Sequence, residues 1–142
     1  MLSPDIVKRK LSLIQDDLVN LGALGEHTIS EVASDPVKQA ALERFLERVI
    51  NRAVDVNQHL IKELATSHTS PPKDYRETFM RLSELGLYPK DFAEEICKSI
   101  GTRNALTHEY DNVNNELIYN SVDDCLRDYK KYIDYVLDFL AR

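Results

Sequence analysis

The chain has 142 residues, of which 43% are hydrophobic and 30% are charged, and its formal net charge is −6. This length fits one domain, residues 1–142, and a domain of this size buries roughly 70% of its unfolded surface. No apolar run approaches the roughly 20 residues that span a bilayer, the N-terminal residues lack the pattern of a signal peptide, and the acidic balance argues against a broad basic face for nucleic acid. We therefore expect a cytoplasmic protein with no membrane association.

Start and stop signals divide the chain into helices. Proline occupies a helix start at Ser3-Pro4, Asp35-Pro36 and Tyr88-Pro89, and the first two follow a good N-cap residue. Residues 66–73 contain Ser-Pro-Pro and form a loop, and Gly86 is placed to end a helix. Pairs with capping-box spacing mark two further starts, and these pairs are Asp74 with Glu77 and Ser121 with Asp124.

Between these signals apolar residues recur at alternating steps of three and four, which is the spacing of amphipathic helices. Five helices are predicted: the first through Val7, Leu11, Ile14, Leu18 and Leu21; the second from about Pro36 to Ala65; the third through Phe79, Leu82 and Leu85; the fourth from Pro89 to beyond Ile100; and the fifth through Val122, Tyr129, Val136 and Leu140. No convincing strand is present. The short links predict an all-α, antiparallel up-and-down bundle of about five helices.

Cysteines and tyrosines of the last two helices are interpreted as packing residues. Cys97 and Cys125 fall on apolar stripes, where a disulfide is not expected in a chain without secretion signals. A redox or metal role is the less favoured alternative. Tyr129, Tyr132 and Tyr135 are expected in the core or at its rim.

The fourth helix changes character after Gly101. Its apolar stripe continues into Arg103, Asn104, Thr107 and His108. Burying such side chains without partners would cost several kcal/mol. The polar patch must therefore line a cleft, meet a second polar surface or lie at a subunit interface.

The same stretch reads Arg103-Asn104-Ala105-Leu106-Thr107-His108-Glu109-Tyr110, or Arg-x4-His-x-Tyr. This pattern resembles HEPN domains and, with asparagine after the arginine, their HepT branch. The segment from Asp55 to Leu60 resembles the Asp-x3-His-Leu segment of that family, and the order and lengths of the helices agree over nearly the whole chain.

The resemblance implies a HEPN-like fold and a metal-independent endoribonuclease toxin of a toxin–antitoxin pair, acting on cellular RNA, with tRNA one candidate. It also implies a homodimer with the motif at a shared cleft. The expected partner is an MNT-type nucleotidyltransferase antitoxin that transfers AMP onto Tyr110. Phosphate added there would compete for Arg103.

The residue types suit this chemistry. Histidine has an unperturbed pKa of about 6.5, so His108 could take and give a proton near neutrality. Arg103 offers a planar fork of donors for phosphate oxygens. Asn104 could orient a base or the histidine, and Tyr110 could stack on a base or bind the phosphate. Asp55 is a supporting candidate that could hold Arg103 or His108.

Helix geometry leaves one difficulty. At 100° per residue, His108 lies about 140° from Arg103, whereas Tyr110 shares the face of Arg103. Either the helix ends or bends near His108, or a second protomer completes the site. A dimer would also double the local positive charge.

Other interpretations remain open at this stage. Arg103 and Asn104 could form only a helix-end anchor, and His108 could be structural. Asp55 and His59, four residues apart, are more readily a hydrogen-bonded structural pair than a catalytic one. The four histidines lack metal-ligand spacing, so no metal or other cofactor is expected. The alternative function is a non-catalytic HEPN module that binds a nucleotide or docks a nucleotidyltransferase.

Overall fold

The computed structural model describes residues 3–108 and 115–142, apart from the side chains of His108 and Asn115. Over this part of the chain every regular element is a helix, which confirms the predicted all-α bundle. The helices are α1 (Pro4–Leu24), α2 (Ile29–Ala33), α3 (Pro36–Leu64), α4 (Tyr75–Glu84), α5 (Lys90–Ile96), α6 (Ser99–His108) and α7 (Asn115–Leu140). None of the helices within these ranges is long and apolar enough to cross a membrane.

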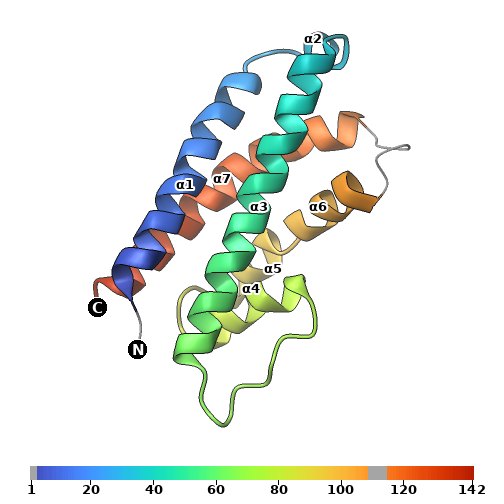
Figure 1. Ribbon diagram of the computed structural model, residues 1–142. Coiled ribbons are helices and arrows are strands. Elements are labelled where there is room, and N and C mark those ends of the chain that lie inside the picture. Colours follow the sequence, from blue (N-terminus) through green and yellow to red (C-terminus); the bar gives the residue numbers. More distant parts are fainter. Residues whose placement is uncertain (1–2, 109–114) are drawn as a thin grey trace.

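The long helices α1, α3 and α7 form the body of the bundle, and α4, α5 and α6 lie on the other side of α3 from α1 (Figure 1). Among the described residues, helices α3 and α7 each contact five other helices, and α3 makes the most extensive of these contacts, with α1. The seam between α1 and α3 holds one nearly buried carboxylate. Asp17 lies 3.3 Å from Arg48 and 3.5 Å from Arg52 on α3.

Several predicted helix boundaries are confirmed. The Asp35 carboxylate accepts from the backbone N–H of Val37 and Lys38, and the Asp74 carboxylate accepts from the N–H of Glu77. After α4, Gly86 has φ +91°, a conformation that glycine adopts without a steric penalty. The N–H groups of Gly86 and Leu87 bond to the carbonyls of Ser83 and Leu82, which is the Schellman pattern.

The prediction of one continuous fourth helix is wrong, because the chain forms α5 and α6 with a joint at Cys97-Lys98. The Ser99 hydroxyl donates to the carbonyl of Ile96 at 2.7 Å, and the N–H groups of Ile100 and Gly101 bond three residues back instead of four. The Ser99 hydroxyl also lies 2.7 Å from the Tyr129 hydroxyl of α7. These contacts tighten the chain at the joint and separate α6 from α5.

Three other boundaries differ from prediction. Pro89 is the N-cap of α5 rather than its first residue, and Ser3 makes no side-chain cap bond. Helix α7 begins at Asn115, one and a half turns before Ser121, whose hydroxyl donates to the carbonyl of Ile118 instead of capping a helix.

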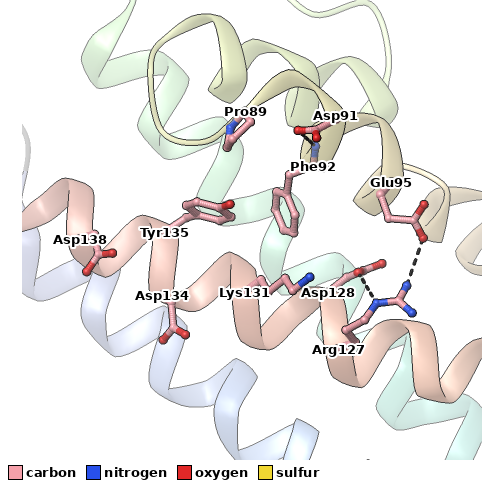
Figure 2. A pocket seen from close by; sticks show the side chains of 10 residues that line it. All are labelled: Pro89, Asp91, Phe92, Glu95, Arg127, Asp128, Lys131, Asp134, Tyr135 and Asp138. Atoms are coloured by element: carbon pink, nitrogen blue, oxygen red, sulfur yellow. Dashed lines mark hydrogen bonds and ion pairs between the residues drawn. The ribbon is translucent and has the colours of Figure 1, made fainter.

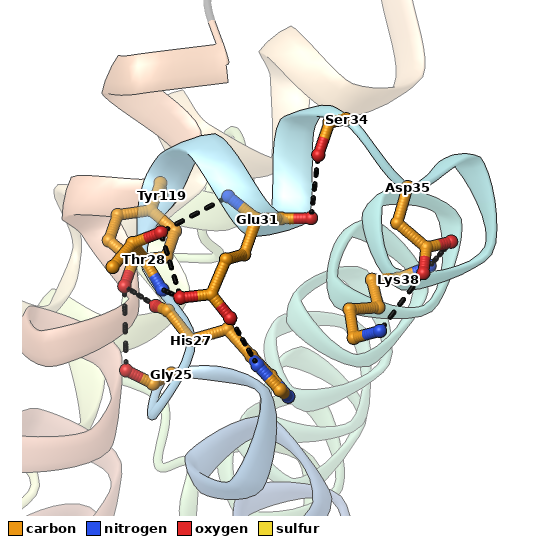
Figure 3. Close-up of polar contacts among 8 residues, drawn as sticks. All are labelled: Gly25, His27, Thr28, Glu31, Ser34, Asp35, Lys38 and Tyr119. Carbon is orange, nitrogen blue, oxygen red and sulfur yellow. Dashed lines mark hydrogen bonds and ion pairs between the residues drawn. The ribbon is translucent and has the colours of Figure 1, made fainter.

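The short helix α2 was not predicted. Thr28 caps it, with its hydroxyl accepting from the N–H of Glu31 while the Glu31 carboxylate accepts from the N–H of Thr28. Figure 3 shows this corner together with Tyr119 of α7, whose hydroxyl donates to the carbonyl of His27. The corner therefore ties the start of α7 to the connection between α1 and α2.

The interior agrees with the packing roles predicted for the cysteines and tyrosines. Tyr129 and Tyr132 are fully buried, and Tyr135 is partly buried against the core. Burial raises the pKa of the Cys125 thiol to about 12 and also raises the pKa of the half-buried Cys97 thiol, and both cysteines are free. Neither thiol is therefore ionised near neutral pH, as expected for packing residues.

A buried chain of hydrogen bonds connects α7, α3 and α4. The Tyr132 hydroxyl donates to Asn57 Oδ1 at 2.5 Å, and Asn57 Nδ2 donates to Thr78 Oγ1 at 3.1 Å. The Thr78 hydroxyl then donates to the backbone carbonyl of Tyr75 at 2.6 Å. We call this set the Tyr132–Asn57–Thr78 chain. It fixes the first turn of α4 on α3.

Replacing Tyr132 with phenylalanine should destabilise the fold. The change leaves Asn57 Oδ1 buried without its principal donor, which costs about 1–3 kcal/mol of unfolding free energy. Urea unfolding of the two proteins measures the difference. Tyr135→Phe is the matched control, because the Tyr135 hydroxyl has no hydrogen bond among the described residues; an equal loss in both variants would contradict the role of the chain.

Candidate active site

Arg103 lies on the side of α6 that packs against α3, and it is half-buried. Its Nε donates to Asn51 Oδ1 of α3 at 3.1 Å, and its Nη1 donates to Asn104 Oδ1 at 3.3 Å. The guanidinium carbon lies 5.2 Å from the ring centroid of Tyr75, the first residue of α4. Three helices therefore fix the position of one guanidinium group.

The remaining donors of Arg103 suit an anionic ligand. A guanidinium carries five N–H donors, and two of them are used in these bonds, so three have no partner among the described residues. An arginine held from one side presents its other donors as a planar fork that matches phosphate oxygens. The Arg103–Asn51–Tyr75 arrangement is thus a candidate phosphate-binding group.

Asn104 and Thr107 support the same stretch of α6. Asn104 is exposed, and its Nδ2 has no hydrogen bond within the described part of the chain. The Thr107 hydroxyl donates to the carbonyl of Arg103 at 3.1 Å. Arg103, Asn104 and Thr107, which were predicted to interrupt the apolar stripe, therefore lie at the surface of α6 rather than in a buried cluster.

The side chains of two motif residues, His108 and Tyr110, lie outside the described part of the chain. His108 is the last described residue of α6, and its side chain lies outside the described residues. Tyr110 lies entirely outside them. The roles of His108 as acid–base catalyst and of Tyr110 as modification site therefore remain predictions.

The predicted pairing of Asp55 with His59 is wrong. Asp55 is exposed, and His59 Nε2 is buried without a hydrogen-bond partner. Asp55 also does not hold Arg103, because Asn51, one turn earlier on α3, occupies that position. The carboxylate of Asp55 points to solvent on the same side of α3 as Asn51, since residues four apart share a helix face.

Asn51 and Tyr75 are the site residues that the sequence interpretation missed. An asparagine in the middle of a long helix has a low helix propensity, and this one precedes Asp55 by one turn. That anomaly was a usable signal for Asn51. Tyr75 follows the N-cap Asp74, but nothing in its local sequence indicates a contact with Arg103.

A cavity of about 740 Å³ lies between α5 and α7 (Figure 2). Five carboxylates and only two cations line it, beside the aromatic rings of Phe92 and Tyr135. The carboxylates are those of Asp91, Glu95, Asp128, Asp134 and Asp138. Burial raises the pKa of Asp128, although Arg127 binds it at 3.1 Å. This acidic cavity would repel a phosphodiester, so it is not the candidate site.

Within residues 3–108 and 115–142, no group of three or more histidine, cysteine, aspartate or glutamate side chains is arranged to hold a metal ion. The candidate site contains an arginine, two amides and an aromatic ring. These groups bind anions and planar ligands.

An all-helical bundle that holds at its surface the arginine of an Arg-x4-His-x-Tyr sequence is the arrangement expected of a HEPN-class protein. The family model described as HepT-like ribonuclease matches residues 14–136. The chain belongs to the HepT-like ribonuclease family, which confirms the resemblance inferred from the sequence.

Curated relatives agree with this assignment. The tRNA nuclease HepT of Aphanizomenon flos-aquae is 26% identical over 141 residues, which cover 98% of this chain and 92% of that protein. A putative RNase of Archaeoglobus fulgidus is 32% identical over 114 residues, covering 80% of this chain and 83% of the relative.

Solved structures share the fold. The tri-AMPylated HEPN toxin of Shewanella oneidensis, solved in complex with an MNT antitoxin, superposes with a TM-score of 0.83 at 20% identity, covering 96% of this chain and 99% of that one. YutE from Bacillus subtilis, a cytosolic protein of unknown function, gives a TM-score of 0.83 at 14% identity, with 98% and 91% covered.

Asn51→Ala should loosen the Arg103 side chain. A single hydrogen bond contributes about 0.5–1.5 kcal/mol, so the Arg103 Nε–H should exchange with solvent about 2- to 10-fold faster in the variant. Nitrogen-15 NMR of the arginine side chains measures this rate. The exposed Arg44 Nε–H serves as internal reference and should not change; unchanged exchange at Arg103 would show that Asn51 does not hold it.

Proposed function

We propose that this chain is a metal-independent endoribonuclease toxin that cleaves cellular RNA, with tRNA one candidate substrate. The supporting observation is the guanidinium of Arg103, which Asn51 and Tyr75 hold in place with three donors left over, in a chain that belongs to a ribonuclease family. The relative from Aphanizomenon flos-aquae, named as a tRNA nuclease, favours the substrate class.

In the proposed reaction, the ribose 2′-hydroxyl attacks the adjacent phosphorus, and the bond to the 5′-oxygen of the next nucleotide breaks. His108 takes the proton of the attacking hydroxyl or gives one to the leaving oxygen, and such catalysis typically contributes about 10²- to 10⁴-fold. The free donors of Arg103 bind the non-bridging oxygens, where charge builds up. Asn104 orients the bound nucleotide.

We propose a homodimer with the site at a shared cleft. On a straight helix His108 lies about 140° from Arg103, so a second protomer would supply the missing side of the site. A second Arg103 would also offset the net charge of −6 around the substrate. Asp55, exposed one turn from Asn51, is proposed as a supporting residue that approaches His108 at this cleft.

RNA cleavage in excess chelator tests the proposal. Arg103→Ala should lower kcat/KM by about 10²- to 10³-fold, the usual effect of removing a donor to a developing charge. His108→Ala should lower it by about 10²- to 10⁴-fold. Cleavage of labelled tRNA and of unstructured RNA, followed on gels, measures both.

Arg44→Ala and His68→Ala are matched controls, because both residues are exposed and far along the chain from the motif. Their kcat/KM should stay within about 2-fold of the original, as expected for surface changes. An absolute requirement for magnesium, or full activity of both motif variants, would refute the mechanism.

We also propose that an MNT-type nucleotidyltransferase antitoxin neutralises the chain by transferring AMP onto Tyr110. The related Shewanella oneidensis toxin is AMPylated in its complex with an MNT antitoxin. Each transfer would add phosphate charge to the motif that contains Arg103, and that phosphate would occupy the donors the substrate needs.

Incubation with ATP and an MNT-type nucleotidyltransferase should add mass in whole AMP units, measured by intact mass spectrometry. Tyr110→Phe should abolish the increase, because the acceptor hydroxyl is gone. Tyr135→Phe, which removes a hydroxyl elsewhere, should leave it unchanged. If Tyr110→Phe still gains the full mass, Tyr110 is not the acceptor.

A non-catalytic binding module is the second candidate, and the acidic balance of the chain favours it. Such a module would bind a nucleotide or dock a nucleotidyltransferase, and it would not cut RNA. His108→Ala would then have no effect on product formation, since no product would form with either protein.

A further inference from the structure

A second, smaller cavity lies beside Arg103. It has a volume of about 160 Å³, lies between α4 and α6, and is lined by Asp74, Tyr75, Arg76, Ile100 and Asn104. Two of these residues also contact the arginine: Arg103 donates to Asn104 Oδ1 and lies over the ring of Tyr75. The cavity and the proposed phosphate-binding group therefore share walls.

The walls of this cavity are suited to a planar, polar-edged ring. Tyr75 is 39% exposed and offers an aromatic surface, and the buried Ile100 adds an apolar one. Asn104 contributes an amide N–H₂ group with no partner among the described residues, and Asp74 contributes a carboxylate that uses only Oδ1 to cap α4. A nucleobase has a flat apolar face and donors and acceptors at its edge.

Gly101 makes room for the guanidinium group of Arg76 at this cavity. A Cβ atom at position 101 would lie 3.3 Å from Arg76 Nη2, tighter than ordinary contact. The hydrogen atom of glycine thus lets the Arg76 guanidinium approach the backbone of α6. A bare phosphate would not make use of Ile100 or Tyr75 and would be repelled by Asp74, so the composition of the walls favours a base over a second phosphate.

We propose that this cavity binds a nucleobase of the RNA, that of the nucleotide whose phosphate Arg103 holds, and that it gives the enzyme a preference among bases. This inference rests on the proposed function for its RNA ligand. The base packs against Tyr75, and Asn104, Asp74 and Arg76 read its edge.

Binding of mononucleotides tests this subsite without any cleavage. The probes are the four ribonucleoside 5′-monophosphates and ribose 5-phosphate, titrated into the full chain and followed by protein NMR shifts. Stacking of a base on an aromatic side chain and contacts to its edge should make at least one nucleotide bind about 5- to 150-fold more tightly than ribose 5-phosphate.

Variants separate the base contact from the phosphate contact. Tyr75→Leu should remove most of the difference between that nucleotide and ribose 5-phosphate, while Tyr75→Phe, which keeps the ring, should retain it. Asn104→Ala should change which base is preferred, whereas Asn20→Ala, an exposed asparagine of α1, should not. Because Tyr75 also supports Arg103, the affinities for the nucleotide and for ribose 5-phosphate are compared within the same variant, so that any loss of phosphate binding cancels from their ratio.

The test of the base-binding subsite can be judged separately from the test of RNA cleavage. If a nucleotide binds more tightly through Tyr75 but RNA is never cut, the subsite stands and the ribonuclease proposal fails. If RNA is cut but ribose 5-phosphate binds as tightly as all four nucleotides, or if none of the five binds, the subsite is refuted and the ribonuclease proposal is unaffected.

Discussion

The site depends on the buried Tyr132–Asn57–Thr78 chain of hydrogen bonds. An amide buried in an apolar interior must be satisfied, and Asn57 meets this requirement by bonding α7 on one side and α4 on the other. The last bond of the chain ends on the backbone carbonyl of Tyr75. The position of the ring beneath Arg103 is therefore set from the centre of the bundle rather than by a surface loop.

Arg103 has a rigid support because its contacts come from separate helices. Asn51 belongs to α3, Tyr75 to α4, and the arginine itself to α6. A side chain held in this way loses little further entropy when it binds an anion. The support is also local, which explains how a chain with a net charge of −6 can present a single cationic group to a polyanion.

Most of the fold was predictable because its boundaries are encoded locally. Asp35 and Gly86 act through bonds within a few residues, and the all-α fold that such signals suggested is confirmed. The family assignment, which came from the Arg-x4-His-x-Tyr motif, is confirmed as well. The joint between α5 and α6 was not predicted, since the Ser99 hydroxyl is bonded to Tyr129, 30 residues away. Helix α2 was missed although Thr28 and Glu31 have the capping-box spacing, because five residues carry too little periodicity.

The site was predicted only in part, because some of its contacts are local and others join residues far apart in the sequence. Arg103 and Asn104 were identified as a polar interruption of an apolar stripe, and they are bonded to each other in the structure. Asn51 is 52 residues from Arg103, so its role is invisible to spacing arguments. The expected pair of Asp55 and His59 does not form, because shared helix phase permits a contact without requiring one. His108 and Tyr110 stay predictions.

The joint at Cys97-Lys98 has a consequence for how this family of sequences can vary. In an uninterrupted helix, one inserted residue rotates everything after it by about 100°, and such a change upstream would swing the arginine away from α3. A new helix begins at Ser99, and the Ser99 hydroxyl is hydrogen-bonded to Tyr129 of α7. Insertions or deletions in α5 can therefore be absorbed before α6 begins. Relatives should therefore differ freely in the length of α5 while preserving the count from Ser99 to Arg103.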